Sequence, residues 1–253
     1  MSELIVVKVG TGVLTRVADG RLDGGSLVRL VAGLAEQVRA GRRIILVSSG
    51  AVGAGVSALG LSRYPDVLAE KQAAAAVGQA RLMHVYENLF SHFELCIAQV
   101  LLTGRNLRSV EVSSRVKDTM DCLLERDNIV PIINQNDSIA VEELSQGDND
   151  MLSVQIALLL KADKLILLTS ADGLCESDGG KLIPEVKCIE EAKTFAEAHS
   201  GKFSTGGMSS KLGAVEVALN AGVEVIIGNG RKPERLADIV EGKGTCTRFP
   251  VEK

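Results

Sequence analysis

Two lysines, far apart along the chain, each lie beside a glycine-rich segment. Lys8 is near the end of the apolar run ELIVVKV and is followed by Gly10, Thr11 and Gly12. Lys211 ends the stretch KFSTGGMSSK, which contains two adjacent glycines and four hydroxyl side chains. A lysine in an apolar strand is costly to bury unless an anion pairs with it. A loop of N–H and O–H donors that ends in a cation suits a polyphosphate. Both lysines are therefore candidates for phosphate binding.

Two common nucleotide-binding motifs fit the sequence poorly. A P-loop needs glycine before its lysine and Ser or Thr after it, whereas Ser210 precedes Lys211 and Leu212 follows it. The stretch VSSGAVGAG, residues 47–55, begins a GxGxxA pattern after a strand. Its small residues would let backbone N–H groups approach a ligand. However, a dinucleotide site also expects a second strand ending in Asp or Glu, and the Ala-rich run KQAAAAVGQARL takes that place.

The densest group of polar residues lies between residues 134 and 150. It contains Asn134, Asn136, Asp137, Asp148, Asn149 and Asp150. Asp148 or Asn149 could cap the helix that follows, but capping explains one residue and not six. Carboxylates and amides near a phosphate site could hold Mg²⁺, orient a lysine or bind a substrate ammonium. The three histidines lie in predicted helices away from these segments, so we expect no histidine base.

Strands that alternate with helices would position these residues. Apolar runs predict strands at residues 3–9, 42–49, 94–102, 128–134, 164–169 and 223–228. Helical periodicity predicts helices at residues 21–41, 71–92, 112–127, 151–162, 189–200, 211–222 and 233–242. This order indicates an α/β fold, a three-layer αβα sandwich with a mainly parallel central sheet, in a single domain over residues 1–253. Ligands of such sheets bind beyond the carboxyl ends of the strands, where the candidate residues lie.

Composition narrows the function classes. A net charge of -4, 3% aromatic residues and no Trp disfavour a nucleic-acid partner. The apolar runs are far shorter than the roughly 18 residues of a membrane span, and we expect no membrane partner. No secretory signal precedes the first strand, which predicts a cytoplasmic protein. The five cysteines are widely spaced and suggest neither a disulfide framework nor a zinc site.

Seven segments together resemble the amino acid kinase family, and in particular its glutamate 5-kinases, over the whole chain. They are, in order, VVKVGTGVL, VSSGAVGAG, KQAAAAVGQ, PIINQNDSIA, GDNDMLS, KLILLTSADGL and STGGMSSKLGA. The pairing of NQND with GDND is what points to glutamate as the acceptor. The resemblance implies the amino acid kinase fold, with an acceptor-binding half at about residues 1–163 and a nucleotide-binding half at about 164–253.

The resemblance also implies roles for single residues. Lys8 and Lys211 would contact the transferring phosphoryl group, and Asp148 would help to hold them. The substrate-binding set implied in this way is Ser49, Gly50, Ala51, Asn134, Asp137 and Asn149. The ATP-binding set is Lys8, Gly10, Thr11, Thr169, Ser170, Thr205, Gly206, Gly207, Met208, Ser209, Ser210 and Lys211. No metal ligand is predicted directly, although Asp150 is a candidate.

The implied reaction transfers the γ-phosphoryl group of ATP to the side-chain carboxylate of L-glutamate, the first step of proline biosynthesis. That carboxylate is ionised at pH 7, so no general base is needed. The family further implies Mg²⁺, a homo-oligomer, feedback inhibition by L-proline and transient contact with the glutamyl phosphate reductase. The chain departs from the family pattern at Ser170 and Cys175, and it ends where many members carry a C-terminal PUA domain.

Three alternatives stay open at this point. A related kinase could act on N-acetylglutamate, aspartate, carbamate or a nucleotide monophosphate with the same lysines but another acceptor pocket. A regulatory module could bind nucleotide without chemistry. A nicotinamide-dependent oxidoreductase is the third alternative.

Overall fold

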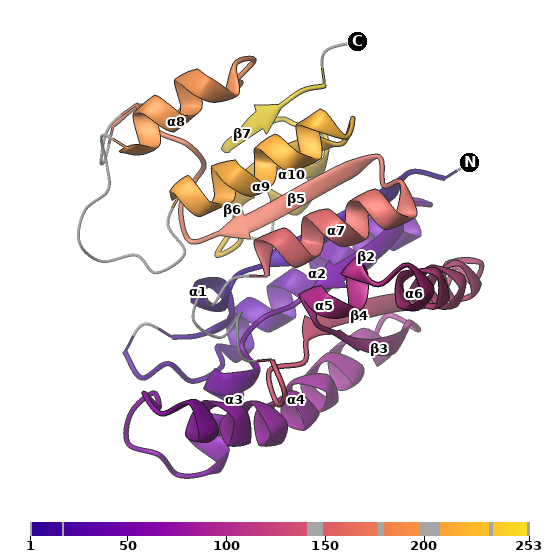
Figure 1. Cartoon of the computed structure of the whole chain (residues 1–253), viewed down its shortest axis with the longest axis vertical. Helices are drawn as coiled ribbons and strands as arrows, with labels where there is room; N and C mark the ends of the chain where they lie inside the picture. Colours follow the sequence, from indigo (N-terminus) through magenta and orange to yellow (C-terminus); the bar gives the residue numbers. More distant parts are fainter. Residues whose placement is uncertain are drawn as a thin grey trace.

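The computed structural model describes residues 2–16, 18–140, 149–176, 180–197, 208–232 and 235–251. Within these ranges seven strands form one sheet in the order β3-β4-β2-β1-β5-β6-β7 (Figure 1). Their bounds are β1 Leu4–Val9, β2 Arg43–Val47, β3 Cys96–Leu102, β4 Ile129–Gln135, β5 Lys164–Thr169, β6 Glu224–Asn229 and β7 Cys246–Phe249. All neighbours are parallel except β6 and β7. The six predicted strands are confirmed, and the antiparallel edge strand β7 was not predicted.

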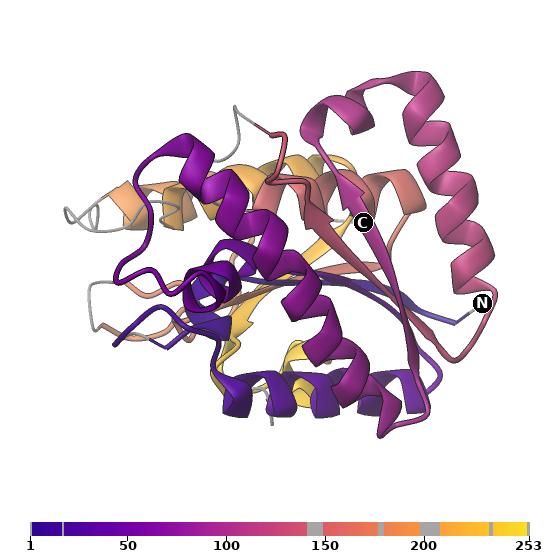
Figure 2. The ribbon, with the colours of Figure 1, turned by 90° about the horizontal axis from the view of Figure 1, so that it is seen from below.

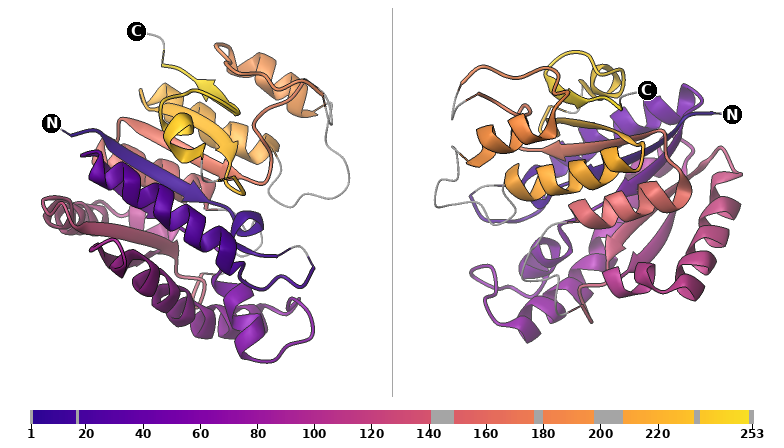
Figure 3. Two further views of the ribbon diagram at one scale, coloured as in Figure 1. Left: turned by 180° about the vertical axis from the view of Figure 1, so that it is seen from behind. Right: turned by 45° about the horizontal axis from the view of Figure 1, so that its top comes forward.

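Helices cover both faces of the sheet, which confirms the predicted three-layer sandwich (Figures 2 and 3). One face packs against α2 (Gly24–Arg39), α4 (Leu68–Ser91) and α10 (Leu236–Val240). The other face packs against α6 (Val110–Leu124), α7 (Asp150–Leu160) and α9 (Met208–Asn220), with α8 (Ile189–Glu197) beside α9. Successive strand residues point to opposite faces. Val7 accordingly belongs to the α2 and α4 core, and Val6 to the α7 and α9 core. Lys8, two residues after Val6, therefore faces α7 and α9.

Three short helices were not predicted: α1 (Thr11–Leu14), α3 (Ala51–Ala58) and α5 (Gly104–Arg108). The glycines of the α3 segment serve helix packing. A Cβ atom on Gly55 would lie 1.8 Å from the carbonyl oxygen of Ala74 in α4, and one on Gly78 would lie 1.8 Å from that of Ala51. From the sequence, these glycines were predicted to allow close approach of a ligand, whereas at Gly55 the structure shows close approach of two helices.

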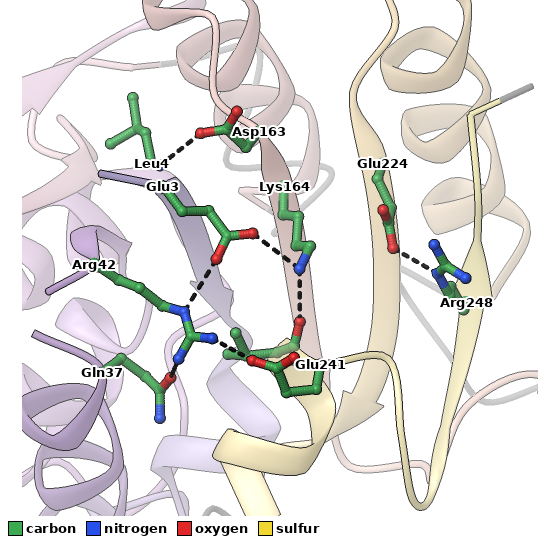
Figure 4. A network of polar contacts seen from close by, with 10 residues as sticks. Glu3, Leu4, Gln37, Arg42, Asp163, Lys164, Glu224, Glu241 and Arg248 are labelled. Carbon is green, nitrogen blue, oxygen red and sulfur yellow. Dashed lines mark hydrogen bonds and ion pairs between the residues drawn. The ribbon is translucent and has the colours of Figure 1, made fainter. Parts of the chain in front are cut away.

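Charged side chains tie the amino ends of the strands together, at the opposite end of the sheet from Lys8 (Figure 4). Glu3 pairs with Lys164 at 2.9 Å and with Arg42 at 3.0 Å, and Arg42 also contacts Glu241. Burial would raise the pKa of Glu3, but the hydrogen bonds from Lys164 and Arg42 outweigh it and lower that pKa. This cluster joins β1, β2, β5 and the end of α10, and leaves the carboxyl edge of the sheet for ligands.

No helix in the described ranges combines the length and the apolar character that a bilayer crossing requires.

Candidate active site

Lys8 is a buried cation at the carboxyl end of a central strand. Lys8 is 1% exposed, and it pairs in register with Val47 of β2 and Leu167 of β5. The Nζ atom lies 2.6 Å from Oδ1 of Asp150, the first residue of α7. A carboxylate at a helix N-terminus is favoured by the helix dipole. The anion that makes this lysine tolerable inside the sheet is thus supplied by the protein.

Lys211 reaches the same carboxylate from the other side. Its Nζ atom in the first turn of α9 lies 3.0 Å from Oδ2 of Asp150. The structure therefore brings together the two lysines, 203 residues apart, on one buried aspartate. The family resemblance implied the lysine-holding role for Asp148, which lies outside the described residues. Asp150, which stood only as a candidate metal ligand, makes both contacts, and that could not be chosen from the sequence GDND alone.

Both oxygens of Asp150 face ammonium groups, which disfavours a divalent cation on this carboxylate. Elsewhere in the described ranges, no three or more His, Cys, Asp and Glu side chains cluster in a way that could hold a metal ion.

The predicted acceptor residues form a buried amide network at the ends of β2 and β4. Asn149 Nδ2 donates to the carbonyl oxygen of Ser48 at 2.6 Å and to Oδ1 of Asn134 at 2.8 Å, and lies 3.4 Å from Ser49 Oγ. Asn134 in turn donates to Oε1 of Gln79 at 2.8 Å. Gln79, on α4, was not among the predicted residues. The available signal was its place at the end of KQAAAAVGQ, one of the seven segments that carry the family resemblance.

Gly50 and Ala51 start α3 beside this network. Gly50 has a φ of +93°, a left-handed conformation that glycine adopts at little cost, and it is the N-cap residue of α3. The helix leaves its first backbone N–H groups without intrahelical acceptors. Gly50 follows the end of β2 by three residues, so these groups lie at the carboxyl end of that strand, which suits an anionic ligand group.

A cavity of about 310 Å³ adjoins the network. It is lined by Gln79 and the alanines around it on α4, by Gln99 and Leu101 of β3, by Gln135, and by the loop after β4 that contains Asp137. Burial raises the pKa of Tyr64, and the negative charge of Asp137 raises it further. Asp137 thus gives one wall of the cavity a negative charge close to that tyrosine.

The residues predicted to bind nucleotide lie at the ends of β1 and β5. The Gly10 N–H donates to the carbonyl oxygen of Leu168 at 3.2 Å. A Cβ atom on Gly12 would lie 4.0 Å from Ser170 Oγ, so the two loops are close together. Thr169 is buried, and its Oγ1 accepts from the N–H of Ala171, whereas Ser170 is exposed. Thr11 starts α1, and Met208, Ser209 and Ser210 start α9. Thr205, Gly206 and Gly207 lie outside the described residues.

The loop after β6 borders the ends of β1 and β5 and was not among the predicted site segments. The Arg231 guanidinium donates to the carbonyl oxygen of Gly12 at 2.9 Å. Asn229 Nδ2 donates to Asp172 Oδ1 at 2.7 Å, and this hydrogen bond lowers the pKa of Asp172. The signal available in the sequence was the polar run NGRK directly after a strand.

A mainly parallel αβα sheet with two lysines gathered at its carboxyl edge is the architecture of an α/β phosphotransferase that handles anionic substrates. The model of the amino acid kinase family matches residues 3–229, and the chain belongs to that family. The resemblance expected from the seven sequence segments is therefore confirmed.

Relatives at moderate identity support this assignment. A protein named glutamate 5-kinase from Serratia proteamaculans (strain 568) is 44% identical over 254 residues, which is 98% of this chain and 69% of that protein. One from Moorella thermoacetica is 45% identical over 97% of this chain and 66% of its own length.

Solved structures share the fold at low identity. A carbamate kinase from Giardia lamblia bound to AMP-PNP aligns with a TM-score of 0.67 at 15% identity, over 98% of this chain and 99% of its own. UMP kinase from Ureaplasma parvum aligns with a TM-score of 0.67 at 13% identity, over 99% of both chains.

Proposed function

We propose that this protein transfers the γ-phosphoryl group of ATP to the side-chain carboxylate of L-glutamate, giving L-glutamyl 5-phosphate and ADP. The observation that carries this proposal is the pairing of Lys8 and Lys211 with one buried carboxylate beside an amide network and a small polar cavity. Relatives that are 43–45% identical and carry the name glutamate 5-kinase support the choice of acceptor.

The chemical difficulty of this reaction is repulsion between two anions. The glutamate carboxylate is ionised at pH 7 and attacks without help from a base. Lys8 and Lys211 reduce the repulsion, and they stabilise charge as it moves from the γ-phosphoryl oxygens to the leaving ADP. Asp150 holds both ammonium groups in place before substrates arrive. Positioning and electrostatics therefore supply most of the rate.

Asp137 selects a free amino acid. Its carboxylate on the cavity wall pairs with the α-ammonium group of L-glutamate. An N-acylated acceptor lacks that positive charge and would leave Asp137 beside a neutral amide. Carbamate likewise offers Asp137 no α-ammonium group. These points favour a free amino acid over N-acetylglutamate and carbamate.

ATP lies across the ends of β1 and β5 in this proposal, with Gly10, Thr11, Thr169 and Ser170 near it and the start of α9 over its phosphates. Mg²⁺ held together with ATP would supply further charge neutralisation. Residues from about 164 onward would form the nucleotide half, and those before it the acceptor half. The homo-oligomer, inhibition by L-proline, contact with the reductase and a cytoplasmic location are proposed from the family resemblance.

The decisive test measures ADP release from ATP and Mg²⁺ with a panel of acceptors: L-glutamate, N-acetyl-L-glutamate, L-aspartate, carbamate and UMP. Hydroxylamine in the assay traps an acyl phosphate as a hydroxamate. We expect ADP and hydroxamate in equal amounts with L-glutamate and far less with the other acceptors. ADP release with another acceptor in preference to L-glutamate would refute the proposal. Nucleotide binding without turnover on any acceptor would indicate a regulatory module.

A further inference from the structure

Gln79 presents a buried hydrogen-bond donor to the cavity beside the amide network. The residue is 8% exposed, and its Nε2 atom has no hydrogen-bond partner among the described residues. Buried polar atoms in proteins are almost always paired, so an unpaired one at a cavity wall requires an explanation. The residue lines the cavity together with Asp137.

The orientation of this amide follows from its neighbours. The N–H of Gln135 can only donate, and it lies 2.9 Å from one end of the Asn134 side chain, which must therefore be the oxygen. The other end of Asn134 is then the NH₂ group, and it donates to Gln79 at 2.8 Å. The atom of Gln79 that accepts must be its oxygen. Its NH₂ group is consequently the end without a hydrogen-bond partner in the part of the chain that the structure describes.

The two asparagines of the predicted substrate-binding set are largely occupied by the protein. Asn149 Nδ2 carries two hydrogens, and it has the Ser48 carbonyl oxygen at 2.6 Å and Asn134 Oδ1 at 2.8 Å. Asn134 donates one hydrogen of its Nδ2 group to Oε1 of Gln79. The unpaired Nε2 of Gln79 is thus better placed to serve as a side-chain donor to an arriving anion.

We propose that Gln79 Nε2 donates a hydrogen bond to the α-carboxylate of the amino-acid acceptor, while Asp137 pairs with its α-ammonium, so that Gln79 is a specificity-determining residue. A zwitterion carries both groups on one carbon atom, and the cavity offers a donor and a carboxylate on its walls. Acceptors without an α-carboxylate leave the donor unpaired and are disfavoured for that reason. This inference rests on the proposed function, because it assumes that the cavity takes the acceptor.

The test compares L-glutamate with 4-aminobutyrate, which keeps the reacting carboxylate and the amine and lacks the α-carboxylate. Binding of each to the full chain is measured by isothermal titration calorimetry at pH 8, alongside ADP release. We expect Gln79→Met to lower the preference for L-glutamate over 4-aminobutyrate by about 10- to 100-fold, the value of a hydrogen bond to a charged group. Gln72→Met and Gln72→Glu, two turns earlier on α4 and outside the cavity lining, should leave the preference unchanged.

A second variant separates substrate binding from support of Asn134. Gln79→Glu keeps an oxygen for Asn134 but replaces the donor with a negative charge. We expect it to bind L-glutamate more weakly than Gln79→Met does. If Gln79 only supported Asn134, the order of the two variants would reverse. That reversal, an unchanged preference, or equal losses for both ligands would overturn the inference.

The two proposals fail in different ways. If the wild-type protein binds L-glutamate with the expected dependence on Gln79 but releases no ADP, the inference stands and the proposed function falls. If it phosphorylates L-glutamate while both Gln79 variants keep the wild-type preference, the proposed function stands and the inference falls. If it does not bind L-glutamate at all, both are overturned.

Discussion

Replacing Asp150 with asparagine tests the charge arrangement on which catalysis is proposed to depend. The substitution keeps the shape of the side chain and removes the negative charge between two ammonium groups. The side chains of Asp150 and Lys8 are each 2% exposed and that of Lys211 is 13% exposed, so water compensates little. The variant therefore leaves a buried lysine beside a neutral amide.

The size of the effect can be worked from these contacts. Breaking a buried ion pair by removing one partner costs about 3–5 kcal/mol. The remaining asparagine oxygen accepts one hydrogen bond, which recovers about 1 kcal/mol. We expect the free energy of unfolding to fall by about 2–4 kcal/mol, which for a chain of this size lowers Tm by about 5–15 °C. Loss of preorganised lysines should lower kcat by about 100-fold or more.

Thermal unfolding and ADP release measure the two effects, and added inorganic phosphate gives a third reading. With no carboxylate between them, the lysines of Asp150→Asn should bind phosphate more tightly, so phosphate should raise the Tm of the variant more than that of the wild type. Asp163→Asn is the matched control, since Asp163 is exposed and accepts from the Leu4 N–H at the amino end of β1. Wild-type Tm and kcat in Asp150→Asn would refute the reasoning, as would equal stabilisation of both proteins by phosphate.

Four further substitutions test separate parts of the structure. Lys211→Ala should lower kcat by about 100-fold while the glutamate KM changes little, because its ammonium group acts on the phosphoryl group; near-normal turnover in steady-state kinetics would remove it from the mechanism. Asp137→Ala should raise the glutamate KM by about 10-fold or more and leave the ATP KM unchanged, and an unaltered glutamate KM would exclude its pairing with the ammonium. Gly55→Ala would place a Cβ atom 1.8 Å from the Ala74 carbonyl oxygen and should destabilise the fold by about 3 kcal/mol in urea unfolding. Gly213→Ala, in an open helical position, should instead stabilise it by about 0.5–1 kcal/mol, so equal effects would contradict the packing argument.

The parts of the fold that the sequence predicted are those specified by local pattern. β1 and β5 are continuous apolar runs that are buried on both faces, and α2 has a regular apolar stripe. Helix α3, which was not predicted, has neither a continuous apolar strand pattern nor an apolar stripe. Its residues, AVGAGVSA, are small and mostly apolar on every side of the helix, and its glycines are needed for contact with α4. Strand β7 was missed because its four residues, CTRF, are too short to show a period.

The residues of the candidate site likewise divide into those that a local sequence pattern predicts and those that depend on the fold. Lys8 could be proposed because a cation inside an apolar strand breaks a strong local rule, and Lys211 because it ends a run of donors. The partner shared by these lysines could not be chosen from GDND, since the choice depends on where α7 begins and which side chain then turns toward β1. Gln79 was not predicted because its role depends on a contact with the amide of Asn134. That residue is close in space but 55 residues away along the chain.

The charge balance of the site suits a carboxylate that positions lysines without competing for them. Each ammonium group carries three N–H donors, and Asp150 needs one from each lysine. Phosphoryl oxygens of a bound substrate would compete for the other N–H groups of these lysines while the aspartate keeps both nitrogens in place. Within the described residues, the two lysines and Asp150 sum to a charge of about +1, which suits an anionic substrate better than a neutral cluster would. A second carboxylate on the same lysines would cancel that charge and weaken the attraction for phosphoryl oxygens.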